Sequence, residues 1–280
     1  IRDLLARRMQ NIVLIGMPGS GKSTVAALLG KKLGRPVTDS DAAVEAAKAC
    51  GKVVLFLGLP ESAEFEGADR KTMALPKEQL ELADAVLAAA AQSVVVLTCG
   101  APVELPFADR TDAMLLTYLC GEATAEAAAE ILFGETNPSG KIAETFPMRL
   151  EDTPSYLNFP GTFDNCDYAE GIYIGYKYYE TAADDMNAEN PGSGDEWYDS
   201  QVLYPYGYGL SYTTFDWELM PAADTAITDP FQKLSMQVKV TNTGDVAGKE
   251  VVQVYANPPY TKGGIEKASA NLVGFAKTDL

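Results

Sequence analysis

Short, predominantly apolar segments alternate along the chain with alanine-rich segments of helical periodicity, and this alternation constrains the fold more than any other feature. The apolar runs are typical of strands buried on both faces. They occupy residues 11–15, 52–57, 93–97 and 113–118. Helices are expected over residues 76–91 and 122–132. Strands that alternate with helices predict an α/β fold, a mostly parallel sheet with helices on both faces.

The pattern changes near residue 213, after which the sequence predicts strands alone. Residues 234–240 alternate apolar and polar side chains, as in a half-buried strand, and residues 242–245 form a turn. Further strands are expected over residues 214–219, 250–256 and 272–275. About seven strands make a sandwich of this kind, so we expect an incomplete all-β sandwich. Residues 181–200, which are acidic and polar, are predicted to be an exposed loop.

Charge and composition exclude several classes of function. Lysine and arginine number 22, aspartate and glutamate 39, and the formal net charge is −17. So acidic a chain is a poor partner for nucleic acid, because that binding depends on cations that neutralise phosphates. The chain has no histidine, which excludes Ser-His, Cys-His and histidine-metal mechanisms within it. No apolar run of about 18 residues occurs, so no membrane span is expected.

The cysteines indicate reduced thiols. Cys50, Cys99, Cys120 and Cys166 form no CxxC pair and are too few for a disulfide scaffold in 280 residues. The sequence has no N-x-[ST] glycosylation acceptor and opens with no charged-then-apolar leader. These features favour a cytoplasmic location.

A phosphate-loop pattern follows the first apolar run. Residues 16–23 match G-x-x-x-x-G-K-[ST], and helical spacing begins at Thr24. Glycines let successive backbone N–H groups turn toward phosphate oxygens, and the helix presents its positive end to the same site. We expect Lys22 to reach the outer phosphates of ATP and Ser23 to ligate Mg²⁺. The predicted nucleotide-binding residues are Gly16, Gly19, Ser20, Gly21, Lys22, Ser23 and Thr24. A plain glycine turn is the alternative interpretation.

Asp39 and Asp41 follow a second expected strand, where paired carboxylates suit a metal-bound water and a substrate hydroxyl, although a surface turn explains them equally well. With the phosphate loop, the segment up to Lys48 resembles the N-terminal part of shikimate kinase. The resemblance implies that Asp39 works near Mg²⁺ and that Asp41 binds the shikimate hydroxyls. The family's carboxylate-binding arginines, second glycine motif and lid have no match, and positioning is most of phosphoryl-transfer catalysis. Shikimate kinase is therefore the alternative function, beside a non-catalytic hybrid that binds nucleotide or sugar.

A second resemblance covers more than half of the chain. It is carried by seven runs in order: Phe56–Glu61, Glu66–Arg70, Gly100–Pro106, Phe133–Lys141, Glu144–Pro147, Tyr168–Tyr179 and Tyr204–Tyr212. Residues 53–212 resemble the C-terminal α/β sandwich of glycoside hydrolase family 3, the β-glucosidase type. The strands after residue 213 resemble the start of the fibronectin type III-like domain that often follows it. We therefore divide the chain into a kinase-like fragment (1–49), an N-terminally incomplete sandwich (50–212) and a truncated fibronectin-like domain (213–280).

The family 3 resemblance implies that Glu66 is the general acid/base, and that the substrate is a β-glucoside or a related oligosaccharide with no cofactor. A carboxyl on a mobile loop suits this role, because it can lean over a sugar site on another domain. Glu61 and Glu64 are interpreted as solvated acids without a role, and Asp69 with Arg70 as a pair that orients the loop. The family's nucleophile is an aspartate on a separate (β/α)₈ barrel that this sequence lacks, so we predict that the chain alone hydrolyses no glycoside. The aromatic run from Tyr204 is interpreted as packing against the next domain rather than as a sugar platform.

The two resemblances suggest a geometric hypothesis. The kinase-like strand at residues 11–15 and its helix form a βα unit, which could replace the unit that the sandwich lacks. The hypothesis requires residues 11–15 to pair in parallel with residues 53–57.

Overall fold

The computed structural model describes residues 13–16, 26–28, 31, 43–50, 52–162, 164–221, 229, 231–261 and 263–280. Within them, four parallel strands form one sheet in the order β1-β2-β3-β4. The strands are β1 (Val13–Gly16), β2 (Lys52–Gly58), β3 (Gln92–Thr98) and β4 (Ala113–Leu116). The predicted parallel sheet is confirmed.

Strand β1 joins the sheet at its edge. Val13 lies opposite Val53 and Ile15 opposite Leu55, in parallel register. This is the pairing that the hybrid hypothesis required, so the pairing is confirmed, while a kinase-like origin of the strand stays a hypothesis.

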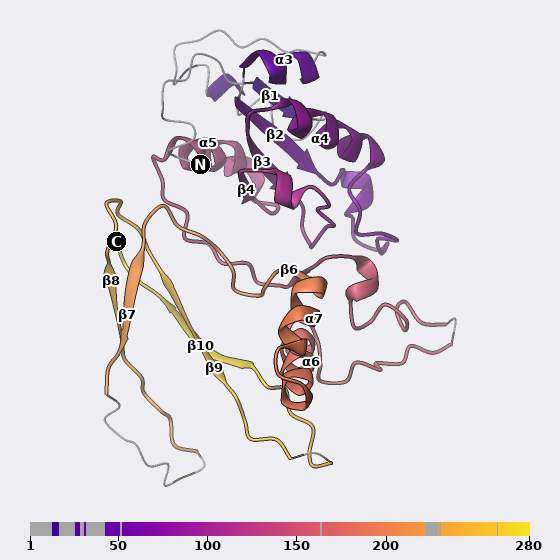
Figure 1. The fold of residues 1–280 in the computed structure, drawn as a ribbon, viewed down its shortest axis with the longest axis vertical. Helices are drawn as coiled ribbons and strands as arrows, with labels where there is room; N and C mark the ends of the chain where they lie inside the picture. Colours follow the sequence, from indigo (N-terminus) through magenta and orange to yellow (C-terminus); the bar gives the residue numbers. More distant parts are fainter. Residues whose placement is uncertain are drawn as a thin grey trace.

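Helices cover both faces of the sheet, as expected (Figure 1). Because successive residues of a strand point to opposite faces, Leu55 and Phe56 enter two separate apolar clusters. One cluster includes side chains of α3 (Ala43–Cys50) and α4 (Lys77–Ala89), and the other includes side chains of α5 (Thr124–Phe133). The full burial of both strand faces explains why the sequence of β2 and β3 is continuously apolar rather than alternating.

The prediction of an exposed loop over residues 181–200 was wrong. This segment forms most of two packed helices, α6 (Tyr176–Glu189) and α7 (Ser193–Gln201). Gly194 packs so closely on the Ala183 carbonyl that a side chain there would overlap it. The acidic and polar residues form the outward face of the pair, while Pro191 and Gly192 make the short turn between them. The polar face of a helix was thus mistaken for a loop.

The remaining strands pair antiparallel. Strand β5 (Phe146–Pro147) pairs with β6 (Val202–Tyr204), β7 (Phe215–Leu219) with β8 (Val238–Asn242), and β9 (Val251–Ala256) with β10 (Asn271–Lys277). The four strands expected after residue 213 are therefore confirmed within the described residues. Strand β8 begins at Val238, so the expectation that it starts at residue 234 was wrong.

The aromatic run between the sheet region and these strands is packed, mainly on itself and on α5 and α6, and its contacts with the later strands include the hydrogen bond from Gln253 to the Gly207 carbonyl (3.1 Å). Tyr204 stacks on Tyr208 with ring centroids 5.4 Å apart, and Tyr206 stacks on Tyr176 at 4.6 Å. The Tyr212 hydroxyl donates a hydrogen bond of 2.8 Å to the last turn of α5. The run thereby ties the end of the α/β region to its neighbours.

Short 3₁₀ helices complete the architecture: η1 (Glu61–Ala63), η2 (Ala108–Arg110), η3 (Gly121–Ala123) and η4 (Leu150–Asp152). Of the helices in the described ranges, none has the length and apolar character that crossing a membrane requires.

Candidate active site

The candidate site lies where β2 and β3 end. Parallel strands bring their carboxyl ends to one edge of a sheet, which is where α/β proteins place ligands. The Gln79 side chain holds the end of β2 by accepting from the Gly58 N–H (2.9 Å) and donating to the Gly58 carbonyl (2.7 Å). A Cβ at Gly58 would overlap the Thr98 carbonyl, so glycine lets the two strand ends approach. The segment after β2 therefore starts from a rigid base.

Glu66 occupies the tip of a tight turn in that segment. Phe65 and Ala68 form an isolated antiparallel bridge, and between them Gly67 has φ +90°, a conformation that favours glycine. Glu66 is exposed, and no hydrogen bond or ion pair reaches its carboxylate from the residues that the structure describes. A carboxyl so presented is available to a ligand or to another domain.

The residues flanking the turn are anchored, which sequence reasoning missed. The Glu64 carboxylate accepts from the Gly100 N–H at 2.9 and 3.1 Å, so Glu64 is not the solvated bystander that was predicted. Arg70 donates from Nη2 to the Pro102 carbonyl at 2.9 Å. The predicted Asp69–Arg70 pair is absent from the described ion pairs, because the Arg70 side chain turns inward while Asp69 stays exposed. Glu61 is exposed on η1, and its lack of a role stays a prediction.

Behind the turn lies a group of titratable side chains, of which Cys99 is buried and Tyr118 and Glu144 are half-buried. Burial, with a smaller contribution from the Glu64 charge, raises the pKa of Cys99 to about 12. Burial also raises the pKa of Glu144, although the Tyr118 hydroxyl and the Arg70 charge partly offset it. Tyr118 itself has φ +49°, and its hydroxyl is buried without a hydrogen bond of good geometry within the described residues. Arg70 is the cation that acts on both Cys99 and Glu144.

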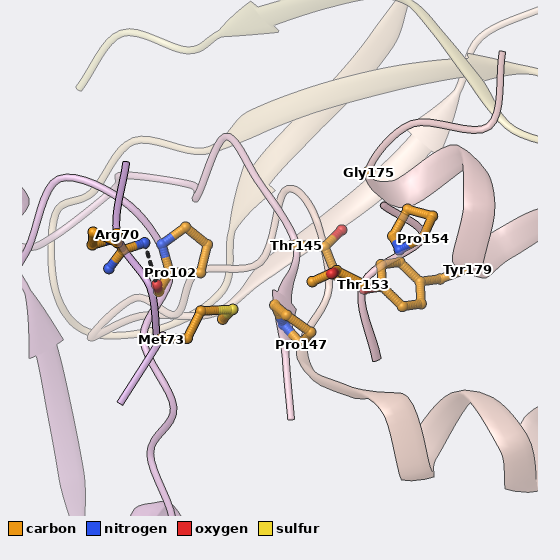
Figure 2. Close-up of a pocket in the computed structure, with 9 residues that line it drawn as sticks. All are labelled: Arg70, Met73, Pro102, Thr145, Pro147, Thr153, Pro154, Gly175 and Tyr179. Carbon is orange, nitrogen blue, oxygen red and sulfur yellow. Dashed lines mark hydrogen bonds between the residues drawn. The ribbon is translucent and has the colours of Figure 1, made fainter. Parts of the chain in front are cut away.

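A small cavity of about 200 Å³ lies beside Arg70, whose side chain forms part of its wall (Figure 2). Its lining residues are Arg70, Met73, Pro102, Thr145, Pro147, Thr153, Pro154, Gly175 and Tyr179. Figure 2 shows the Arg70 hydrogen bond to Pro102 at one end of the cavity and Tyr179 of α6 at the other. Because its walls are mostly apolar and hold no carboxylate, the cavity is not itself a candidate for acid/base chemistry.

A second exposed feature is an apolar arm, residues 153–162 and 164–175, which projects from the body of the molecule on the same flank as the Glu66 segment (Figure 1). Its own hydrogen bonds shape it: the Asn158 side-chain amide donates to the Asp167 carbonyl and to Glu170, both at 2.8 Å. Its exposed large apolar side chains are Tyr156, Leu157, Phe159, Tyr168, Ile172 and Ile174. An apolar surface of this kind is typical of an interaction site.

The phosphate-loop residues gain no structural support. Gly16 ends β1, while Gly19, Ser20, Gly21, Lys22, Ser23 and Thr24 lie outside the described residues, as do Asp39 and Asp41. Nucleotide and Mg²⁺ binding there stay predictions. Among the side chains that the structure does describe, no group of three or more acidic or cysteine residues is arranged to hold a metal ion.

Comparison with known proteins decides the family. Residues 4–176 match the glycosyl hydrolase family 3 C-terminal domain. The chain belongs to glycosyl hydrolase family 3. The matched residues include the segment that resembles shikimate kinase, and the kinase alternative has no support from the relatives described below.

Relatives of this family 3 chain are similar over most of its length. It is 38% identical over 265 residues to thermostable β-glucosidase B of Acetivibrio thermocellus. The aligned residues make up 94% of this chain and 33% of the relative. It is also 38% identical over 246 residues to an exo-α-(1→6)-L-arabinopyranosidase of Bifidobacterium longum, covering 88% of this chain and 30% of the relative.

Solved structures give the same picture of this family 3 chain. The β-glucosidase of Kluyveromyces marxianus in complex with glucose has a TM-score of 0.73 at 37% identity, over 85% of this chain and 26% of that one. The family 3 β-glucosidase of Bifidobacterium adolescentis has a TM-score of 0.73 at 38% identity, over 88% of this chain and 34% of that one. The chain thus spans about a third or less of the length of these relatives.

Proposed function

We propose that this chain is the acid/base-bearing C-terminal region of a retaining β-glucosidase-type hydrolase. The observation that supports the proposal most directly is the turn at Glu66, in which one exposed carboxylate, unpaired within the described part of the chain, stands between two anchored neighbours. Of the three glutamates in the segment, Glu64 is engaged by Gly100 and Glu61 lies on η1. Glu66 is therefore the glutamate whose carboxyl is best placed to meet a substrate.

The chemistry needs a second carboxylate. In a retaining glycosidase two carboxyl groups lie about 5–5.5 Å apart, one acting as nucleophile and the other as acid and then base. In its protonated form Glu66 would donate its proton to the glycosidic oxygen as the bond to the sugar breaks. As the carboxylate it would then take a proton from the water that hydrolyses the glycosyl-enzyme. No cofactor enters either step.

We propose that the nucleophile comes from a (β/α)₈ barrel outside this sequence. The relatives are about three or more times as long as the matched region, which leaves room for such a domain. The apolar arm, together with the exposed Phe65 beside Glu66, offers a surface on which it could pack. On this proposal the chain by itself hydrolyses no glycoside.

The first test measures the release of nitrophenol from an aryl β-glucoside. The chain alone should show none, and Glu66-dependent release by the chain alone would contradict the proposed need for a second domain. A hybrid in which this chain replaces the matching third of the Acetivibrio thermocellus enzyme should be active. Glu66→Gln should lower the kcat/KM of that hybrid by about 10²–10⁴-fold on substrates with poor leaving groups, the usual contribution of a general acid.

Glu61→Gln is the matched control, since it removes one acid from the same segment without touching Glu66. An active hybrid that tolerates Glu66→Gln would overturn the assignment of Glu66. An inactive hybrid with an intact fold would overturn the proposed function.

A further inference from the structure

The turn that presents Glu66 is fixed at two points to one neighbouring turn, residues 99–102. Before the tip, both oxygens of the Glu64 carboxylate accept from the Gly100 N–H. After the tip, Arg70 donates to the Pro102 carbonyl. Both contacts join residues that are more than 30 positions apart in sequence, so neither is a by-product of the local turn.

The turn that receives these contacts is itself closely packed and hydrogen-bonded. Cys99 is fully buried at the end of β3, and a Cβ at Gly100 would lie 2.9 Å from the Leu119 side chain and 3.2 Å from Glu64. Further along, Glu104 receives a hydrogen bond of 3.0 Å from the Leu150 N–H and donates its own N–H to the Met73 carbonyl at 2.9 Å. The hydrogen bonds of Glu64 to Gly100 and of Arg70 to Pro102 therefore hold the Glu66 turn in a fixed position relative to the sheet.

We infer that Glu64 and Arg70 are positioning residues that hold the Glu66 carboxyl at a fixed place and angle above the sheet edge. The inference rests on the proposed function and extends it from Glu66 alone to Glu66 with its two supporting residues, Glu64 and Arg70. Its physical reason is that proton transfer needs the acid within hydrogen-bond reach of the leaving oxygen, so a misplacement of about 1 Å can cost about 10²-fold in rate. Neither residue need touch the substrate.

Leaving-group dependence in the active hybrid tests the inference, because a displaced acid matters only when the leaving group needs a proton. Glu64→Ala should lower kcat/KM about 10- to 100-fold for a methoxyphenyl β-glucoside but less than about threefold for the 2,4-dinitrophenyl β-glucoside. Glu64→Gln should restore most of the loss, since its amide oxygen can still accept from Gly100. Arg70→Gln should show the same selective loss, and Arg70→Lys a smaller one.

The controls are Glu61→Ala for Glu64 and Lys71→Ala for Arg70, each an exposed neighbour of like charge. Equal losses on both substrates would show a general structural defect and overturn the inference. If Glu66→Gln shows the selective loss but neither Glu64→Ala nor Arg70→Gln does, the proposed function stands and the positioning role falls.

Amide hydrogen exchange on the chain itself gives a second, activity-free measurement. Glu64→Ala should speed exchange of the Gly100 N–H by about tenfold, the loss of one charge-assisted hydrogen bond, while the amides of β3 keep their protection. Glu61→Ala should leave Gly100 unchanged. Unchanged exchange at Gly100 in Glu64→Ala would overturn the anchor whatever the hybrid does.

Discussion

The parallel sheet and the C-terminal strands use similar residues in opposite ways. The five central residues of β2 and of β3 are buried, because α3, α4 and α5 cover both faces. Strands β7 and β8 contain no buried residue, and apolar side chains such as Trp217 and Leu219 are exposed there. The first region builds its core from the described residues, whereas the side chains of β7 and β8 are largely exposed.

The largest expected effect contrasts the two regions directly. Leu55→Ala removes a side chain that is 0% exposed in β2 and should cost about 2–5 kcal/mol of unfolding free energy. Leu219→Ala removes one that is 69% exposed in β7 and should change the free energy by no more than about 0.5 kcal/mol. Urea unfolding of both variants checks the contrast. A large cost at Leu219 would mean that a further layer covers β7.

A smaller effect is expected at the junction. The Asn137 side chain accepts from the Tyr212 N–H (2.8 Å) and the Ser211 hydroxyl, and it donates to the Ala247 carbonyl at 3.0 Å. Asn137→Ala leaves backbone groups on both sides without partners and should cost about 1–3 kcal/mol. Hydrogen exchange should rise in β8 and β9 while β3 stays protected. Asn165→Ala, on the exposed arm, is the control, and loss of protection in β3 as well would mean that the two regions unfold as one unit.

The smallest effect is a pH dependence within the sheet region. Burial raises the pKa of Glu144 above its ordinary value of 4.5, so its ionisation opposes folding. The protonated carboxyl of Glu144 favours the folded state. Its contribution to the free energy of unfolding is full below about pH 4.5 and is lost as the pH rises through the raised pKa. Glu144→Gln should therefore gain in melting temperature relative to the wild type as the pH is raised from about 4 to 7. Glu126→Gln, on the exposed face of α5, is the control, and a gap that narrows with pH would contradict the sign.

Most of the fold could be predicted from the sequence, and the wrong predictions have a common cause. Apolar runs and helical spacing located β2, β3, α4 and α5, because buried strands and amphipathic helices impose their periods on local sequence. The same logic failed for α6 and α7, whose few buried residues include Tyr179 and Ala183 on α6 and Gly194 on α7. Their outward polar residues therefore dominated the local pattern.

The candidate site divides in the same way. Glu66 was assigned from the family resemblance carried by the short run Glu66–Arg70, and its catalytic role stays a prediction. The anchors were missed because Glu64 and Gly100 lie 36 positions apart, and no spacing rule links a carboxylate to one distant backbone N–H. Arg70 was chosen correctly as an orienting residue but given the wrong partner, since the adjacent Asp69 was the nearest charge in sequence whereas Pro102 is the nearest acceptor in space.

The sequence by itself determined the family, the parallel sheet and the glutamate on which the proposed chemistry rests. These features follow from short stretches of sequence, because a hydrophobic period or a motif of a few residues can be recognised before the fold is known. Only the tertiary structure decided that β1 pairs with β2 as the hypothesis required, that Glu64 and Arg70 anchor the Glu66 turn, and that β7 and β8 bury no side chain. Each of these depends on which distant segments meet. That is set by the packing of whole elements rather than by any one stretch of residues.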